Sequence, residues 1–287
     1  MLDLNNKEVF HITLKEFREY FHEFTCERLS SDLNNKKLIE DFQSPEMGKE
    51  LERYLKENAW GDDISGETSV YIVKDHYGNF VMYFSLRCGL LYAEDKFNKL
   101  SQEEKDYVLS FKSTIGTDNL NGIYADCISK LGFDKTDMLF QMAQNQLEQK
   151  KSDKELNEAH VALNVDESYS AIEIRHLCKN IHYVCDIPTE VPIGIPVFWE
   201  IIVEKILSIN KIVGCKYLYL FAADNTKEPN TKKLVSHYKS SMGFSDIKDV
   251  KVVKERYDRG CLSLSQEIIE LIKNREEIWN KYSDLFD

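Results

Sequence analysis

Proline, glycine and long apolar runs are scarce in this sequence. Five prolines and twelve glycines are spread over 287 residues, and no linker rich in serine, glycine and proline separates two halves. No apolar run approaches the roughly 20 residues that cross a bilayer. The opening residues, MLDLNNKEVFHITLKEF, lack the charged and then apolar order of a signal peptide. We therefore expect a soluble, cytoplasmic protein with no membrane partner.

Positive charge is also in deficit. Lys and Arg total 37 against 49 Asp and Glu, which gives a formal net charge of −12. Such a charge opposes binding to a phosphate backbone, so the composition argues against a nucleic-acid partner. The apolar share of 43% and the aromatic share of 11% allow a large buried core. Disordered and fibrous classes are therefore excluded.

The seven cysteines form no C-x-x-C pair. Their odd number and wide spacing are typical of a reducing compartment and of buried structural thiols. His176, Cys178, His182 and Cys185 are four potential metal ligands within ten residues, but their spacing matches no usual zinc motif. We expect no metal site.

The first half of the chain predicts an alternation of helices and strands. We expect a short strand in VFHITL, helices in FREYFHEFTCERL and PEMGKELERYLKENA, and a hairpin in ETSVYIVKDHYGNFVMYFSLRCGLLY that turns between Asp75 and Asn79. The sequence then becomes polar and helical, with a capping box in SQEEKDYVLSF. The expected organisation is one domain, 1–287, with a helical insertion at about 93–167.

The second half predicts a strand, a helix, a strand and a helix. The strand YSAIEIRHLC leads through the loop DIPTEVPIGIP into a helix over Val197–Ile212. The strand KYLYLFAAD and the helix TKKLVSHYKSSM follow, and a last amphipathic helix covers about 264–287. This order predicts an α/β fold with a right-handed crossover. The apolar C-terminal helix leaves a homodimer open.

The segment from Ala171 to Phe244 resembles the core of the GNAT superfamily, the acetyl-coenzyme A-dependent N-acetyltransferases. The resemblance rests on the order of the strand AIEIRHLC, a glycine-containing loop at a helix start, the buried strand YLYLFAAD and the segment HYKSSMGF. It implies a mixed, largely antiparallel twisted sheet flanked by helices, with acetyl-CoA as cosubstrate. The helical insertion and the C-terminal helix lie outside it.

The resemblance also implies where the coenzyme binds. Its pyrophosphate is expected at the start of the predicted Val197–Ile212 helix, where free N–H groups attract anions. The family pattern Q/R-x-x-G-x-G/A falls on Val191 to Pro196 and keeps only its central glycine, and Pro196 has no N–H to donate. The implied cofactor-binding residues are Leu177, Cys178 and Lys179 through their backbone, with Gly194, Ile195, Val197 and Asn225.

Two side chains are candidates for proton transfer. Tyr238 stands five residues before Gly243 and resembles the family tyrosine that protonates the departing thiolate. Glu173 alternates with Ile172 and Ile174, and it resembles the glutamate that takes a proton from the amine. In the alternative interpretation, Tyr238 packs its ring and bonds a carbonyl, and Glu173 forms an ion pair.

The leading hypothesis is an N-acetyltransferase that works by direct attack of an amine on acetyl-CoA. A small amine or an amine of a protein suits the charge of the chain as acceptor. Some relatives acetylate charged tRNA and act as toxins, an acceptor that would need a local basic patch here, such as Lys227, Lys232, Lys233 and Lys239. The alternative is a GNAT-fold binding module without catalysis, and a third hypothesis is an α/β domain of another function.

Overall fold

The computed structural model describes residues 12–93, 96–155, 165, 167–223, 230–248, 250–253 and 261–286. The chain divides into two compact units, the larger formed by Met1–Leu91 with Tyr169–Asp287 and the smaller by Tyr92–Ser168. The first half of the larger unit contains α1 (Leu14–Tyr20), β1 (Thr25–Arg28), α2 (Leu33–Leu38), α3 (Lys49–Glu57), α4 (Ala59–Ser65), β2 (Ser69–Lys74) and β3 (Phe80–Ala93). Its second half contains β4 (Glu167–Lys179), α8 (Gly194–Pro196), α9 (Val203–Asn210), β5 (Tyr217–Ala222), α10 (Thr231–Met242), β6 (Ser245–Asp246), β7 (Lys251–Val252), β8 (Leu262–Glu267) and α11 (Leu271–Tyr282).

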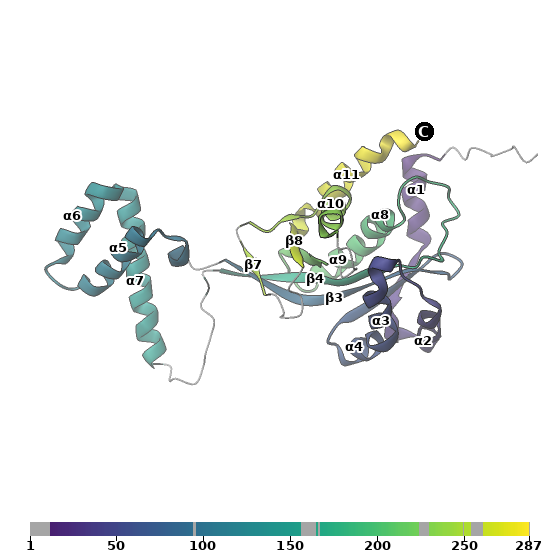
Figure 1. Ribbon diagram of the computed structural model, residues 1–287, viewed down its shortest axis with the longest axis horizontal. Helices are drawn as coiled ribbons and strands as arrows, with labels where there is room; N and C mark the ends of the chain where they lie inside the picture. Colours follow the sequence, from purple (N-terminus) through teal and green to yellow (C-terminus); the bar gives the residue numbers. More distant parts are fainter. Residues whose placement is uncertain are drawn as a thin grey trace, which may run out of the picture. The chain divides into compact units, whose positions relative to one another are not determined.

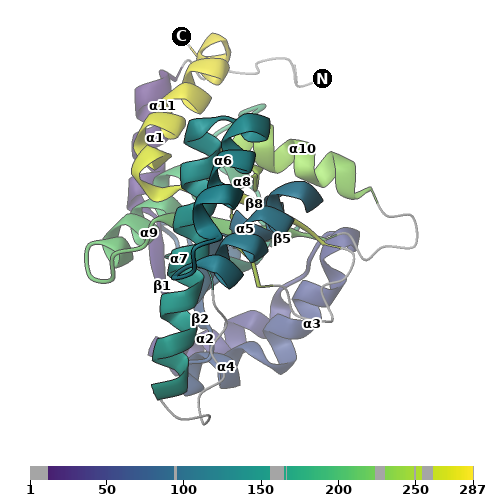
Figure 2. The same ribbon diagram turned by 90° about the vertical axis from the view of Figure 1, so that its left-hand side faces the viewer.

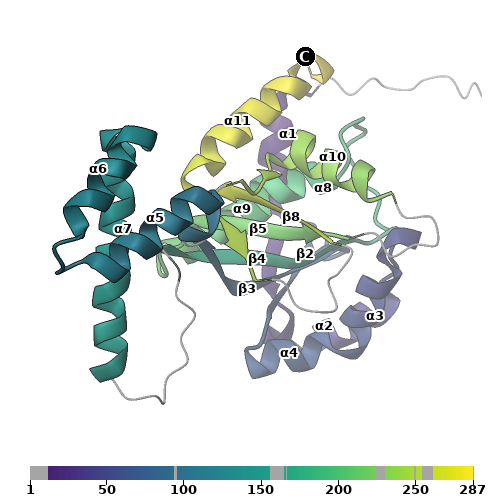
Figure 3. The same cartoon turned by 60° about the vertical axis from the view of Figure 1, so that its left-hand side comes forward.

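One sheet organises the larger unit. Its described strands follow the order β1-β2-β3-β4-β5-β8-β6, and β7 pairs with β3. The β4–β5 pair is parallel, whereas β1–β2, β2–β3, β5–β8 and β6–β8 are antiparallel. Figure 3 shows β4 between β3 and β5. The mixed, largely antiparallel sheet flanked by helices that the sequence predicts is therefore confirmed.

Helices cover both faces of this sheet (Figure 1). On one face, α1 and α8 to α11 pack over a large core that includes Trp199 and Trp279, both about 1% exposed or less. On the other face, α2, α3 and α4 cover a smaller core around Phe42 and Tyr83. Alternation along β2 serves both cores, because Val70 and Ile72 belong to the smaller one while Tyr71 and Val73 belong to the larger one.

The predicted hairpin is present as β2 and β3. Its turn depends on Asp75, whose carboxylate accepts hydrogen bonds from Tyr77 N at 3.0 Å and from Asn79 N at 2.8 Å. Gly78 occupies the left-handed region with a φ of 86°. The turn residues predicted from the sequence thus have the expected roles.

The expected helix in FREYFHEFTCERL is only partly correct. The α-helix α1 begins at Leu14 after a capping box between Thr13 and Glu16, and it ends at Tyr20. Thr25–Arg28 forms β1, which pairs with β2 from Thr25↔Lys74 to Arg28↔Tyr71. Long-range pairing at the sheet edge outweighs the helical pattern of these residues. Leu14, expected at the end of a strand, belongs to α1, and 1–11 lie outside the described residues.

The helix predicted over Val197–Ile212 begins three residues before Val197 and ends two residues before Ile212. It starts with α8 at Gly194, continues with π-helical hydrogen bonding over Val197–Ile202, and ends with α9 at Asn210.

The helix predicted at about 264–287 begins later, because Leu262–Glu267 forms β8, which pairs with β5, and α11 spans Leu271–Tyr282. Helix α11 buries Leu271, Ile278 and Trp279 in the core of its own chain. The apolar face of this helix, which suggested that a homodimer was possible, therefore packs against the core of its own chain.

The smaller unit is a bundle of α5 (Gln102–Thr114), α6 (Leu120–Leu131) and α7 (Phe133–Glu155) (Figure 2). The predicted capping box is present, since Ser101 accepts from Glu104 N and the Glu104 side chain accepts from Ser101 N. Tyr107, Phe111 and Leu139 form part of its separate core. None of the helices among the described residues of either unit is both long and apolar enough to cross a bilayer.

Candidate active site

The parallel strands β4 and β5 share only a short register. Their paired residues run from Ala171↔Tyr217 to Ile174↔Leu220. Beyond this point β4 continues to Lys179, and β5 continues to Ala222 while still paired with β8. Within the described residues, the edge of β4 that faces β5 therefore has no strand partner from 176 to 179.

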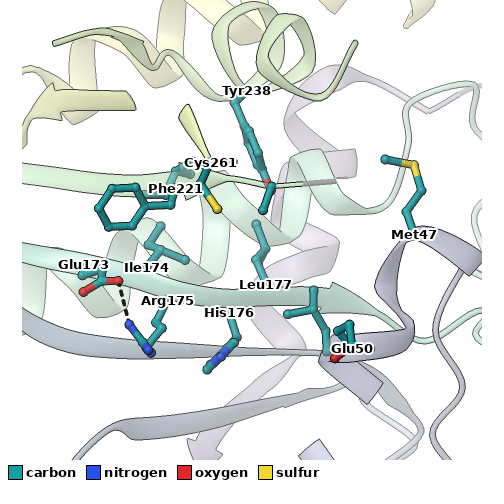
Figure 4. Close-up of a pocket in the computed structure, with 13 residues that line it drawn as sticks. Met47, Glu50, Glu173, Ile174, Arg175, His176, Leu177, Phe221, Tyr238 and Cys261 are labelled. Carbon is teal, nitrogen blue, oxygen red and sulfur yellow. Dashed lines mark hydrogen bonds and ion pairs between the residues drawn. The ribbon is translucent and has the colours of Figure 1, made fainter. Parts of the chain in front are cut away.

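A cavity of about 230 Å³ opens where the two strands part (Figure 4). Strands β4 and β5 form its wall, α10 covers it from one face of the sheet, and the start of α3 approaches from the other. Its lining residues are Met47, Glu50, Leu51, Glu173, Ile174, Arg175, His176, Leu177, Leu220, Phe221, Ala223, Tyr238 and Cys261. The cavity thus combines an apolar interior with a few groups that can donate or accept protons, as ligand sites commonly do.

An irregular alternation in β4 brings polar groups to this wall. Ile174 and Leu177 pack against the larger core, whereas His176 bonds to β3 on the opposite face. Since positions 174 and 177 differ by three, an odd number, strict alternation cannot put both side chains on one face. The alternation is interrupted at Arg175 and His176, directly after the last pair with β5, as one extra residue in a β-bulge would do.

Tyr238 reaches the cavity from α10 (Figure 4). Its half-buried ring packs against the larger core, and burial raises the pKa of its phenol to about 12. The Tyr238 Oη atom has no hydrogen-bond partner among the described residues, so the carbonyl bond of the alternative interpretation is not seen. A protonated, unpaired phenol in a cavity is suited to donate a proton or a hydrogen bond.

Glu173 also lines the cavity, but its carboxylate is already paired. Arg87 donates to Glu173 Oε2 through Nε at 3.0 Å and Nη2 at 2.8 Å. Tyr219 Oη donates to the same oxygen at 3.2 Å, and Arg175 Nη1 lies 3.4 Å from Oε1. With 1% of its surface exposed, this carboxylate is held as an ion pair, which is the alternative that the sequence left open.

His176 is fixed on two sides. Its Nδ1 lies 2.8 Å from Ser85 Oγ, and its ring stacks on the ring of Tyr54 with centroids 3.8 Å apart. Burial, followed by the charges of Arg175 and Arg87, lowers the pKa of His176 to about 3. The ring is therefore neutral at physiological pH. The sequence suggested a possible role for His176 only as a metal ligand, and no local pattern placed it in this cavity.

The end of β4 carries the backbone positions expected to contact the coenzyme. Leu177 lines the cavity, Lys179 is exposed, and Cys178 is buried against the smaller core. The Cys178 thiol has a pKa raised to about 12 by burial, so it is a packing group and not a nucleophile. The edge of β4 at 176–179, which has no strand partner among the described residues on the β5 side, is compatible with a ligand that adds to the strand through its amides.

The loop at the start of α8 differs from the expected pyrophosphate site. Three of its N–H groups already donate within the protein, those of Val191, Ile195 and Val197. Pro196 has no N–H, and the side chains of Ile195 and Val197 are buried in the core. Ile195 and Val197 thus pack in the core and use their N–H groups within the protein, and their contact with the coenzyme stays a prediction.

The surroundings of this loop are also unfavourable for an anion. A cavity of about 330 Å³ beside it is mostly apolar and includes the acidic residue Glu190. Gly194 is the first residue of α8 and is half-buried. Asn225, the remaining residue expected to bind the coenzyme, lies outside the described residues, as does Lys227.

The arginines that hold Glu173 were not predicted from the sequence. Arg87 comes from the hairpin strand β3, far from β4 in the sequence. One signal was available, since Arg87 is a single charged residue in the apolar stretch FVMYFSLRCGLLY. Arg175 and His176 likewise interrupt the alternation of AIEIRHLC, which is a mark of a bulge.

No family model matches the sequence, and no curated protein matches it. Among solved structures, a mutant of the toxin AtaT aligns with 88% of this chain and 93% of its own, at 10% identity and a TM-score of 0.47. A mutant AtaT bound to the C-terminus of the antitoxin AtaR and acetyl-CoA aligns with 86% of this chain and 95% of its own, at 11% identity and a TM-score of 0.43. AtaT complexed with acetyl-methionyl-tRNAfMet aligns with 87% of this chain and 99% of its own, at 14% identity and a TM-score of 0.42. At these identities and TM-scores the activities of the toxins do not transfer to this chain.

Proposed function

We propose that this protein is an N-acetyltransferase that transfers the acetyl group of acetyl-CoA to an amine. The observation that carries the proposal is the parting of β4 and β5 after Ile174 and Leu220, with a cavity at that point and Tyr238 in its wall. A parted parallel pair offers two things at once, an unpaired strand edge and a passage between the two faces of the sheet.

The unpaired edge of β4 supports binding of the pantetheine arm. That arm carries two amides, which can exchange hydrogen bonds with backbone N–H and C=O groups as an added strand does. Residues 177–179 are the positions that would hold it. Coenzyme A supplies the acetyl group as a thioester, and this chain supplies the groups that orient it.

Tyr238 is proposed as the general acid. The amine nitrogen forms a bond to the acetyl carbon, the carbon–sulfur bond breaks, and Tyr238 Oη gives its proton to the sulfur. The nitrogen releases a proton to water, from which Tyr238 is protonated again. A phenol whose pKa is raised to about 12 remains protonated until the sulfur becomes basic, so it is ready at neutral pH.

The acceptor is proposed to be a small amine or an amine of a protein. The cavity of about 230 Å³ leaves room for a small reacting group, and the net charge of −12 favours a cationic partner. A nucleic acid would need a local basic surface. Among the described residues, Lys232, Lys233 and Lys239 on α10 could contribute to such a surface.

Coenzyme binding is the test of the proposal. The thermal unfolding midpoint is measured with and without millimolar acetyl-CoA, and ATP at the same concentration controls for binding of an anion. A ligand at about 100 times its Kd adds about 2.7 kcal/mol to the free energy of unfolding, which corresponds to several degrees. A shift with acetyl-CoA but not ATP supports the proposal, and equal or absent shifts contradict it.

The second candidate function is a binding module of the same fold without catalysis. Two observations favour it, the occupied N–H groups of the α8 loop and the paired carboxylate of Glu173. In this case no acetyl-CoA-specific shift is expected. Mass spectrometry of an acceptor panel, with a small primary amine, a lysine-containing peptide and a charged tRNA, would detect no acetylated product.

A further inference from the structure

His176 is held by two neighbours on the face of the sheet that α3 covers. Its Nδ1 lies 2.8 Å from Ser85 Oγ on β3, and its ring stacks on the Tyr54 ring of α3 with centroids 3.8 Å apart. The Tyr54 hydroxyl donates to Asp62 Oδ2 at 3.0 Å, which fixes the stacked ring in turn. The orientation of the imidazole is therefore determined before any ligand enters the cavity.

Burial decides the direction of the hydrogen bond between Ser85 and His176. Ser85 is 0% exposed, and His176 Nδ1 is the one hydrogen-bond partner of its hydroxyl among the described residues. A hydroxyl has one proton to donate. If Nδ1–H donated to Ser85 Oγ, that hydroxyl proton would be buried without an acceptor, and an unsatisfied buried donor is costly. Ser85 Oγ therefore donates to Nδ1.

The proton of the neutral imidazole is then on Nε2. Burial is the largest cause that lowers the pKa of His176, so the ring carries one proton at physiological pH, and Nδ1 uses its lone pair for Ser85. Nε2 has no hydrogen-bond partner in the part of the chain that the structure describes, and it is not among the fully buried unpaired atoms. His176 lines the cavity between β4 and β5. The ring thus offers a hydrogen-bond donor to a bound molecule.

His176 and Tyr238 meet the cavity from opposite faces of the sheet (Figure 4). Tyr238 packs against the larger core from α10, whereas the contacts of His176 are with β3 and α3. Leu51, near the start of α3 and packed against the smaller core, also lines the cavity. Because Tyr238 is proposed to protonate the sulfur, the side of His176 is left for the molecule that attacks the acetyl carbon.

We propose that the acceptor is an amine with a hydrogen-bond-accepting oxygen close to its nitrogen, and that His176 Nε2–H binds this oxygen. The inference rests on the proposed acetyl transfer and adds to it a specificity residue and a class of acceptor. The attacking nitrogen cannot itself accept from Nε2–H, because its lone pair forms the bond to the acetyl carbon. A donor in a cavity disfavours a ligand that leaves it unpaired, so amines with such an oxygen are preferred.

The position of the ring proton is tested without any substrate. Nitrogen-15 NMR of the protein labelled at histidine distinguishes a protonated from an unprotonated ring nitrogen, and the signals of His176 are those lost in His176→Gln. His176 is expected as the Nε2–H tautomer at neutral pH. Ser85→Ala removes the donor to Nδ1, so the share of the Nδ1–H tautomer should rise in this variant.

Two matched acceptors test the hydrogen bond. Glycinamide and isobutylamine have the same arrangement of non-hydrogen atoms, and glycinamide alone has a carbonyl oxygen. The quantity compared between proteins is the ratio of kcat/KM for glycinamide to kcat/KM for isobutylamine, in which the different basicity of the two amines cancels. The wild-type protein is expected to prefer glycinamide when kcat/KM is calculated for the neutral amine.

Two matched variants test the residue. His176→Gln keeps an N–H donor, whereas His176→Met has a side chain of similar length without one. His176→Met should lower the ratio about tenfold, and His176→Gln should lower it by less than about threefold. His182→Met, at an exposed position, is the control and should leave the ratio unchanged. The unfolding midpoint of each variant shows that it is folded.

The outcomes separate the inference from the proposed function. Absence of the acetyl-CoA-specific unfolding shift overturns both. With that shift present, a proton on Nδ1 of His176, an unchanged tautomer in Ser85→Ala, or no wild-type preference for glycinamide overturns the inference alone. Equal losses for the two amines in His176→Met also overturn it, because Nε2–H would then serve the acetyl oxygen. The wild-type preference needs no variant of His176, so the inference stays testable if these variants do not fold.

Discussion

The two halves of the expected coenzyme site differ in how much of their hydrogen-bonding capacity is already used. At the end of β4, residues 176 to 179 have no strand partner on the β5 side among the described residues, and Tyr238 Oη and His176 Nε2 have no hydrogen-bond partner there either. In the loop before α8, the N–H groups of Ile195 and Val197 are engaged and Pro196 has none. A fold can therefore retain a site for the reacting end of a ligand while the region expected to hold its phosphates is filled by the protein itself.

The buried ion pair beneath the cavity should give the largest effect. Replacing Arg87 by Met leaves the Glu173 carboxylate with Arg175 and Tyr219 only, in a site where 1% of Glu173 is exposed. Loss of one partner of a buried charge costs about 3 kcal/mol of unfolding free energy. Urea denaturation measures this value.

Arg53→Met is the matched control for this prediction. Arg53 pairs with Glu50 on an exposed helix surface, so the same substitution should cost less than about 1 kcal/mol. Equal losses for the two variants would show that the Glu173 pair is not a special feature of the cavity.

The next effect concerns the cavity itself. Tyr238→Phe removes the phenol that donates the proton and keeps the ring that packs against the core. Acetyl transfer should fall about 100-fold with little change in stability, as is usual for loss of a general acid. Tyr77→Phe, at a residue 72% exposed, is the control and should retain full turnover. Full activity of Tyr238→Phe would remove this residue from the mechanism.

A smaller effect follows from the neutral state of His176. Its pKa in the folded protein is lowered to about 3 from an ordinary value of 6.5, so the unfolded chain binds a proton first as the pH falls. Stability is therefore lost between these two values, by at most about 1.4 kcal/mol per pH unit. His176→Gln should lose less stability than the wild-type protein between about pH 6 and 4, measured by urea denaturation. An unchanged pH dependence would contradict the burial of a neutral ring.

The smallest effect is expected in the loop before α8. Gly194 does not have a positive φ, and an added Cβ would meet no atom within 4 Å. Gly194→Ala should therefore leave the acetyl-CoA-dependent unfolding shift unchanged. A phosphate held against this glycine would instead be displaced by the new methyl group. Loss of the acetyl-CoA-dependent unfolding shift in this variant would therefore indicate that the loop does bind the pyrophosphate.

Gly89→Ala is the matched control for Gly194→Ala, because Gly89 lies on β3, near the cavity residue Glu173, and not in the loop before α8. An added Cβ at this position would collide with the Tyr219 ring, which bonds Glu173. This variant should lower stability and alter the cavity, whereas Gly194→Ala should do neither. The pair thus compares the same substitution in the two regions.

Local sequence patterns predicted the elements whose signals are contained in a few neighbouring residues. The hairpin around Asp75, the capping box at Ser101 and the placement of Tyr238 on α10 are confirmed. The strand β1 was missed because its conformation depends on pairing with β2, and no short-range pattern records that. The length of the β4–β5 register was also outside the reach of periodicity, although it decides where the cavity lies.

The sequence by itself determined the class of the fold, the hairpin of β2 and β3, the order strand, helix, strand, helix from β4 to α10, and two side chains that line one cavity, Glu173 and Tyr238. Only the tertiary structure decided their roles. Arg87 reaches Glu173 from a different strand and changes a candidate base into a paired charge, and Ser85 with Tyr54 orients His176. Propensity and spacing act over a few residues along the chain, whereas the state of a titratable group depends on charges, burial and hydrogen bonds brought to it from distant segments.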